Sequence, residues 1–366
     1  MTTHPRLRPG LHQAAAGCPK RMVYGPCGGV RADGGCEVPG LTCSFAAAAD
    51  HLRDLGFAPE LVSAPASARE SGDALATIPR GAAATSFAEA VTTGGVITAG
   101  LPVRSRDPGL IAEAGSRLSA MSAVVTSEGL GTTLSPSHTA LLLAGTGATV
   151  LSALTCRDRN RVALEGELAA LADIGVAGVL AVTGDHSSSA GLPGTSRIGT
   201  TTATMTEPVF DLDSPRLAAL ARRAGLFVAV VERPAAPPSS CRPSRLALKA
   251  SAGAELVIVD LNGDLADLAT FTDALAATGA ALPVLVSVPV VTTDAAAVHV
   301  ATAWAQLVLS APGVSGVHLS ALVDDTDPTG LGTQGLGAVD VLVRMATQLR
   351  EHLERVPPPP RVEPAA

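Results

Sequence analysis

The sequence predicts an α/β protein: a (β/α)8 (TIM) barrel preceded by a small cysteine-rich module. Between about residues 85 and 355, eight short apolar segments alternate with segments of mostly helical pattern, the order expected of a closed parallel barrel. The apolar segments are continuous rather than alternating, as in strands buried on both faces. Four of the six cysteines lie between Cys18 and Cys43, which indicates a separate module at the N-terminus.

The chain divides into four regions. We expect a cysteine-rich module at 1–50, a helical and then Pro-, Ser- and Ala-rich linker at 51–84, the barrel at 85–355 and a Pro-rich, disordered tail at 356–366. Periodicity alone leaves an open doubly wound sheet as the alternative to the barrel. The eight expected strands are VITAG (96–100), AVVTS (123–127), TVLSALT (149–155), GVLAVTG (178–184), LFVAVVE (226–232), ELVIVD (255–260), PVLVSVP (283–289) and GVSGVHL (313–319).

Composition favours a small-molecule ligand. The net charge is -7 with no block of like charges, which argues against a nucleic-acid or anionic-membrane partner. Aromatic residues make up only 2% of the chain, so the core must be built from small and β-branched side chains. Neither a secretory signal nor a run near the roughly 18 apolar residues of a spanning helix is present, so we expect a cytoplasmic protein.

Polar residues gather where the expected strands end. The carboxyl ends of barrel strands meet at one face, and side chains there form the site. Asp185 follows a buried strand, where a carboxylate can bind amino and amide N–H groups or stabilise positive charge. Capping of the next helix is the alternative role for this Asp. The other candidates at or near strand ends are Thr126, Glu128, Thr155, Arg157, Asp260 and His318.

Several of these candidates also have structural roles that the sequence leaves open. Arg157 and Asp158 can form an ion pair that holds a turn. Threonine at a strand end is also a residue of high β propensity. His318 either points into the top of the barrel or packs, and Lys249, in the helix before AGAE (252–255), is either a ligand or a solvated side chain.

The four N-terminal cysteines predict a metal site. Cys18, Cys27 and Cys36 have eight residues between neighbours, Cys43 follows, and nearby Gly and Pro let the backbone turn sharply. Four thiolates in so short a segment can bind one Zn²⁺ or an iron–sulfur cluster. Free thiols are the alternative, because no C-x-x-C pair is present.

Nucleotide-binding motifs are missing from the sequence. No G-x-G-x-x-G follows a strand and no P-loop is present, so a nucleotide site of those types finds no support.

Two segments carry a family resemblance. The strand ending in LTCRDRN (154–160), followed one βα unit later by a strand ending in Gly184 and Asp185, resembles the methylenetetrahydrofolate reductase family. The resemblance continues at EPVFDLDS (207–214), KASAGAE (249–255) and GVHL (316–319). The cysteine-rich segment at about 17–45 resembles a module of methylenetetrahydrofolate reductase-associated proteins, where it is a C-terminal extension or lies on a partner subunit.

The resemblance implies an oxidoreductase of folate one-carbon metabolism that serves methionine biosynthesis. It would reduce 5,10-methylenetetrahydrofolate to 5-methyltetrahydrofolate with NAD(P)H, using FAD as in the family. Asp185 would bind the pterin or stabilise an iminium, and Glu128 or a water would supply a proton. Asp260 and His318 would bind the tetrahydrofolate substrate, and the residues expected at the cofactor are Thr126, Thr155, Arg157 and Lys249.

The chain departs from the family at three positions. Gly100 replaces a glutamate at the end of the first strand, Ala153 replaces a histidine, and Asp260 replaces a glutamine. These losses support an alternative: a non-catalytic folate-binding or scaffold subunit. A third alternative is an electron-transfer subunit with an iron–sulfur cluster. A homo-oligomer or a reductase partner subunit is compatible with each.

Overall fold

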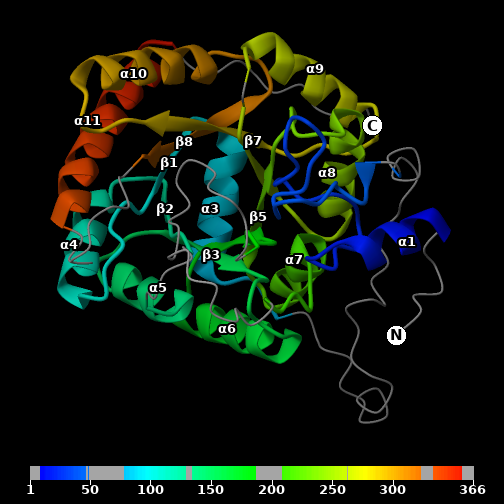
Figure 1. Cartoon of the computed structure of the whole chain (residues 1–366). Coiled ribbons are helices and arrows are strands. Elements are labelled where there is room, and N and C mark those ends of the chain that lie inside the picture. The colour runs from blue at the N-terminus through cyan, green and yellow to red at the C-terminus, as the bar shows by residue number, and fades with distance from the viewer. Residues whose placement is uncertain are drawn as a thin grey trace.

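The structure is a closed parallel barrel. The computed structural model describes residues 9–46, 48, 78–128, 134–186, 208–261, 263–322 and 333–356. Each strand pairs in parallel with the next one in the chain, and β8 pairs with β1 to close the barrel (Figure 1). This confirms the predicted (β/α)8 barrel and excludes the open doubly wound sheet. Most of the predicted linker (residues 51–77) and tail (357–366) lies outside the described residues.

All eight predicted strands are confirmed, with ends that differ by at most two residues. Their Val, Ile, Leu and Ala side chains are almost all buried, as expected of strands covered on both faces. The bounds are β1 Val96–Gly100, β2 Ala123–Val125, β3 Val150–Thr155, β4 Gly178–Val182, β5 Phe227–Glu232, β6 Leu256–Val259, β7 Val284–Val290 and β8 Val314–Ala321.

Helices alternate with the strands and surround the barrel (Figure 1). Six of them begin after a Ser, Asn or Asp whose side chain accepts a hydrogen bond from a first-turn N–H, which satisfies a donor that the helix itself leaves unpaired. The bounds are α4 Pro108–Leu118, α5 Pro136–Ala144, α6 Arg161–Ile174, α7 Ser214–Arg223, α8 Arg242–Ser251, α9 Leu265–Ala276, α10 Ala295–Leu309 and α11 Thr333–Arg355.

A further helix closes the amino-terminal end of the barrel. Helix α3 (Ala82–Thr93) begins three residues before the predicted start of the barrel domain. It packs Phe87 and Val91 into the same apolar cluster as the interior side chains of the strands. Phe87 meets Phe227, the first residue of β5, edge to face with ring centroids 5.1 Å apart. Among the described residues, the barrel interior is thus covered at this end and opens at the opposite end, where the strands finish.

The cysteine-rich module packs against the barrel. It contains α1 (Pro9–Gly17) and the irregular segment that follows, coloured blue in Figure 1. Tyr24 O accepts a hydrogen bond from Arg245 of α8 at 3.1 Å, and Val23 N donates to Asp213, the residue that caps α7, at 3.1 Å. Among the described residues, no helix is both long and apolar enough to span a membrane. The module thus sits on α7 and α8, beside the carboxyl ends of β4 and β5.

Candidate active site at the mouth of the barrel

A cavity of about 280 Å³ opens at the carboxyl ends of the strands, and we call it the mouth cavity. It lies over the ends of β1 to β4 and β8, where parallel barrels carry their sites. The structure therefore brings six of the predicted site residues to one place. These are Thr126, Glu128, Thr155, Arg157, Asp185 and His318, and Gly100 lies among them.

Asp185 lies at the edge of the mouth cavity, directly after β4. Gly184 before it has φ +85°, and a Cβ there would lie 3.0 Å from Thr155 Cβ and 3.1 Å from Arg157 Cβ, so this turn requires glycine. The Asp185 carbonyl accepts a hydrogen bond from Arg157 Nη1 at 3.3 Å. The next described helix, α7, is capped by Asp213 rather than by Asp185. The half-buried Asp185 carboxylate therefore lines the mouth cavity and caps no described helix.

Glu128 is held in an ion pair with Arg159. Arg159 Nη2 lies 2.6 Å from Glu128 Oε1, and Arg159 Nη1 donates to Oε2 at 3.0 Å. The Thr155 N–H also donates to Oε2, at 2.6 Å. This carboxylate ties the end of β2 to the end of β3, so the geometry gives no support to its expected role as a proton donor.

The two threonines at the mouth cavity are already bonded within the protein. Thr126 Oγ1 accepts from the Ala153 N–H at 2.9 Å, and Thr155 Oγ1 accepts from Arg159 Nη1 at 3.4 Å. Arg157 has a mostly buried side chain, with its Nε 3.5 Å from Asp158 Oδ2. The expected ion pair of Arg157 therefore exists, although Arg157 also lines the mouth cavity.

His318 lies beside the position where the family glutamate is missing. Its Nδ1 is 3.0 Å from Thr98 Oγ1, so both residues point into the barrel. A Cβ built on Gly100 would lie 3.7 Å from both His318 Cε1 and Nε2, which places the free edge of the imidazole next to Gly100. Burial lowers the pKa of His318 to about 4. The ring is therefore neutral at pH 7 and can form hydrogen bonds without adding charge.

Two predicted residues lie outside the mouth cavity. Asp260 is 45% exposed after β6, and its Oδ2 lies 2.9 Å from Arg233 Nε. Lys249 is buried rather than solvated, with its Nζ 2.7 Å from Glu232 Oε2. Burial lowers the pKa of Lys249 to about 8, although Glu232 opposes the shift. Neither residue is placed to contact a ligand in the mouth cavity.

Glu232, at the end of β5, is the centre of a buried charge cluster. Its carboxylate faces Arg242 Nη1 at 3.3 Å, Arg245 Nε at 3.8 Å and Lys249 Nζ at 2.7 Å. Burial alone would raise the pKa of Glu232, but these three positive charges lower it to about 2. Sequence reasoning did not single out this cluster. The available signal was the spacing of the three basic residues in α8, which places them near one face of a helix.

The module contacts the loop that carries Asp185 through a buried ion pair. Lys20 Nζ lies 2.6 Å from Glu37 Oε1, and the side chains are 3% and 1% exposed. Lys20 Nζ also donates to Gly184 O at 2.7 Å, and Glu37 Oε1 accepts from the His186 N–H at 2.6 Å. The module therefore holds the backbone on both sides of Asp185, a contact that the sequence did not predict.

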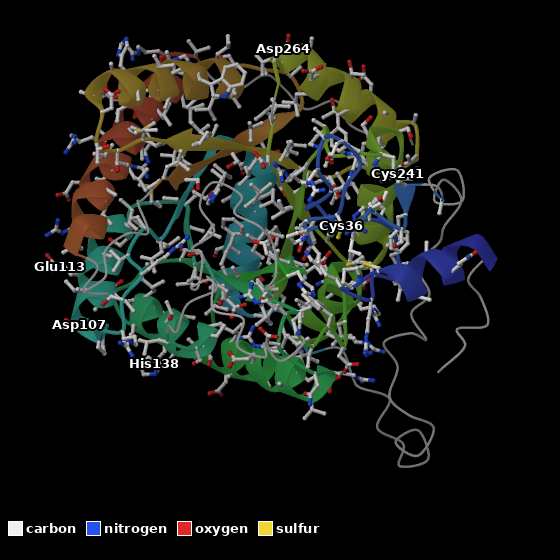
Figure 2. All side chains as sticks on the ribbon, in the orientation of Figure 1. Cys36, Asp107, Glu113, His138, Cys241 and Asp264 are labelled. Carbon is white, nitrogen blue, oxygen red and sulfur yellow. The ribbon has the colours of Figure 1, made fainter. Side chains whose placement is uncertain are left out.

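The four cysteines of the module line one small cavity of about 20 Å³. Their thiols are free, and Cys241, beside α8, lies in the apolar cluster against which Cys18, Cys27 and Cys43 pack (Cys36 and Cys241 are labelled in Figure 2). Burial raises the pKa of Cys18 to about 11. Within the described residues, no three His, Cys, Asp or Glu side chains form a group that could hold a metal ion. The four cysteines are gathered at one cavity, but as described their side chains do not form a completed ligand set.

The Lys20 and Glu37 pair gives a first prediction. Lys20→Met leaves the Glu37 carboxylate buried without its cation, so we expect a loss of about 3–5 kcal/mol in the free energy of unfolding. Urea denaturation of the wild type and the variant measures this difference in the free energy of unfolding. The matched control is Arg117→Met, which breaks a solvent-exposed pair with Asp340 and should cost about 0–1 kcal/mol. Equal losses in the two variants would contradict the structural importance of the buried pair.

The burial of His318 predicts a pH dependence of stability. Because the folded protein keeps this ring neutral down to about pH 4, whereas an unfolded His has a pKa of 6.5, the unfolded state binds an extra proton between these values. The stability that this adds is present above pH 6.5 and is lost as the pH falls towards 4. His318→Gln should therefore flatten the fall of the unfolding free energy in this window, measured by denaturation at several pH values. His138→Gln, at an exposed position, should leave the slope unchanged.

Comparisons with known proteins found one family model and a set of solved structures that are similar to parts of this chain. A family model described as "Methylene-tetrahydrofolate reductase C terminal" matches residues 10–70. No curated protein matches the chain. Among solved structures, 2,3-dimethylmalate lyase, a PEP mutase/isocitrate lyase superfamily member, is 13% identical with a TM-score of 0.43 over 75% of this chain and 88% of that chain.

A second solved structure, tryptophan synthase from M. tuberculosis, is 14% identical with a TM-score of 0.45 over 75% of this chain and 98% of that chain. A putative lyase/mutase from Burkholderia cenocepacia J2315 is 15% identical with a TM-score of 0.40. The match covers 75% of this chain and 92% of that chain. Similarity at this level carries no argument about activity. The N-terminal segment is thus similar to a domain of methylenetetrahydrofolate reductases, and it is joined to a TIM barrel.

Proposed function

We propose that this protein is an oxidoreductase that reduces 5,10-methylenetetrahydrofolate to 5-methyltetrahydrofolate with NAD(P)H. One observation carries the proposal. A segment similar to the C-terminal domain of methylenetetrahydrofolate reductases packs onto the backbone around Asp185, through Lys20 and Glu37. Asp185 in turn lies at the edge of the mouth cavity. The matched module and the candidate catalytic carboxylate therefore form one site.

In this proposal Asp185 has two roles. Its carboxylate accepts hydrogen bonds from the amino and amide N–H groups of the pterin. Opening of the methylene bridge leaves a cationic iminium at N5, and a fixed carboxylate stabilises that charge as it develops. Hydride addition to the methylene carbon then gives the methyl group. The reaction consumes one NAD(P)H and one proton, which goes to N10.

We assign the positioning of that proton to His318 instead of Glu128. The Glu128 oxygens already accept from Arg159 and Thr155, whereas the Nε2 edge of His318 faces the space beside Gly100. Thr98 Oγ1 lies 3.0 Å from Nδ1 and 3.4 Å from Val317 O. When its proton goes to Nδ1 rather than to Val317 O, the Nε2 carries the ring proton and can donate to the substrate or to a water. The neutral imidazole can hold a water by a hydrogen bond, and that water, in exchange with solvent, would bring the proton that N10 takes up while the ring itself stays neutral.

Of the four residues expected to contact FAD, Thr126, Thr155 and Arg157 line the mouth cavity, and Lys249 lies outside it. Thr126 and Thr155 accept hydrogen bonds from Ala153 N and Arg159, and Lys249 is bonded to Glu232. Ala153 itself has no polar side chain to offer. We therefore assign the hydride directly to NAD(P)H, and the assay below compares samples with and without added FAD.

A second candidate function is that of a folate-binding subunit without its own activity. Gly100 supplies no acid, and Glu128 is held by Arg159, so the mouth cavity has fewer proton donors than a reductase of the family. Such a subunit would bind tetrahydrofolates but would not oxidise NAD(P)H.

Substitution of Asp185 tests the proposed chemistry. Asp185→Asn removes the charge that stabilises the iminium, so we expect kcat/KM to fall by about 10²–10³-fold in an assay of folate-dependent NAD(P)H oxidation. Asp340→Asn, in an exposed pair with Arg117 away from the cavity, is the matched control and should keep wild-type turnover. Unchanged turnover in Asp185→Asn would refute the role of this carboxylate. Folate binding with no oxidation, with or without FAD, would favour the second candidate function.

Metal binding by the module remains a separate prediction. Four cysteines around one small cavity are the donor set of a zinc or iron–sulfur site, although the arrangement described above does not complete one. We expect elemental analysis of the purified protein to find about one zinc, or the iron and sulfide of one cluster, per chain. Cys27→Ser should release this metal. Protein that contains less than a tenth of an equivalent of either metal would establish free thiols.

A further inference from the structure

A second cavity lies where the module meets the barrel, and we call it the seam cavity. Its volume is about 170 Å³. Gly28 and Gly29 of the module line one side, and Arg233 at the end of β5 and Arg245 of α8 line the other. It adjoins the mouth cavity, because both are lined by Val182, Gly184 and Asp185. A ligand in the mouth cavity can therefore reach the seam cavity past Asp185.

The side chains around the seam cavity carry excess positive charge. The whole protein has a net charge of -7, so this excess is a local feature. Buried positive charge without a matching anion is costly, because water no longer solvates it. Five buried basic side chains lie at or beside the cavity against three buried carboxylates: Lys20, Arg216, Arg242, Arg245 and Lys249 against Glu37, Asp213 and Glu232.

Pairing within this group is uneven. Lys20 pairs with Glu37, and Arg216 pairs with Asp213 at 2.9 Å. The remaining three basic residues, all in α8, share the single carboxylate of Glu232. Glu232 and the half-buried Asp185 are the described carboxylates that line the cavity. Asp185 adds one negative charge to the three counted above, which does not balance the two positive charges in excess.

Arg245 is the least satisfied of these residues. Arg242 donates to the carbonyls of Ala236, Pro237 and Cys27 as well as to Glu232. Arg245, only 4% exposed, donates from Nη1 to Tyr24 O, but its buried Nε has no hydrogen-bond partner among the described residues. Such unmet donors are rare in folded proteins, and here the residue lines a cavity.

Arg233 joins the two walls of the cavity. Its Nη1 donates to Gly28 O at 3.2 Å, and its Nε lies 2.9 Å from Asp260 Oδ2. The side chain is 32% exposed, so it can be exchanged without burying a new group. A guanidinium presents several N–H groups in one plane, which suits binding of a carboxylate or a phosphate.

We propose that the seam cavity is an anion-binding site for the carboxylate or phosphate end of a ligand whose other end occupies the mouth cavity. Two sources have this chemistry: the glutamyl carboxylates of a folate and the phosphates of a nicotinamide nucleotide. The choice of these ligands rests on the proposed function, but the site rests only on the charges and the cavity. Arg245 and Arg233 are the donors that bind the anion, and Lys249 adds to the positive potential.

Titration with simple anions tests the site without any turnover. The probes are glutarate, for a carboxylate end, and inorganic phosphate, for a phosphate end. Calorimetry measures their binding to the full chain at constant ionic strength. Binding should be saturable for at least one probe. Arg233→Gln should weaken it about tenfold or more, since a charge-assisted hydrogen bond is lost.

The matched control is Arg80→Gln. Arg80 forms a comparable, partly exposed ion pair with Glu255, close to Phe227 at the start of β5 and so at the far end of the barrel. This variant should bind both probes as the wild type does. Stronger binding of glutarate assigns the site to a carboxylate end, and stronger binding of phosphate assigns it to a phosphate end.

Two results would overturn the proposal. One is a wild-type protein that binds neither probe saturably, and the other is equal binding by Arg233→Gln and Arg80→Gln. Because these measurements need no substrate, anion binding in a protein that fails to oxidise NAD(P)H would reject the reductase and keep the anion site. Turnover in a protein that binds neither probe would keep the reductase and reject the anion site.

Discussion

The packing of the module on the barrel depends on the buried ion pairs of the Glu232 carboxylate. This residue ends β5 inside the protein, where a negative charge is stable only beside positive ones, and α8 supplies three of them. Two of those, Arg242 and Arg245, also donate to the carbonyls of Cys27 and Tyr24 in the module. One buried charge thus fixes α8 against β5, and α8 in turn fixes the module.

This arrangement divides the mouth of the barrel into two halves. The ends of β1 to β4 and β8 surround the open mouth cavity, whereas the module lies beside the ends of β4 and β5. Asp185 lies on the boundary, with Lys20 and Glu37 bonded to the backbone on either side of it. The candidate site is therefore built by both parts of the chain, and a barrel without the module would have a different one.

The sequence predicted the barrel and the place of the site because both are encoded locally. Continuous apolar runs mark strands buried on both faces, and polar residues after such runs lie at the same end of a parallel barrel. This was enough to place Asp185 and His318 at one cavity. The pairing of Glu128 with Arg159 was missed, because neither side chain is in a regular element whose period fixes its direction.

The docking of the module was beyond sequence reasoning for a different reason. Lys20 and Gly184 are 164 residues apart, and no local pattern relates them. The burial of Lys249 was missed for the same reason. An amphipathic helix such as α8 can pack against an apolar surface or against charged groups, and its own sequence does not decide between them. The sequence does place Glu232 at the end of an expected strand, but the pairing of Lys249 with this residue, 17 positions away in the chain, is seen only in the structure.

The closed amino end of the barrel has a consequence for how the chain can be cut. The residues just before α3 are already part of the fold: Ile78 N donates to Arg223 O at 2.9 Å, and Arg80 pairs with Glu255. Gly225 has no room for a Cβ because Pro79 O would lie 2.7 Å away. A fragment that starts at residue 85 would lose these contacts and the first turn of α3, exposing the barrel interior to water. A fragment meant to fold as a barrel must therefore begin at or before residue 78, earlier than the boundary at residue 85 that the sequence predicts.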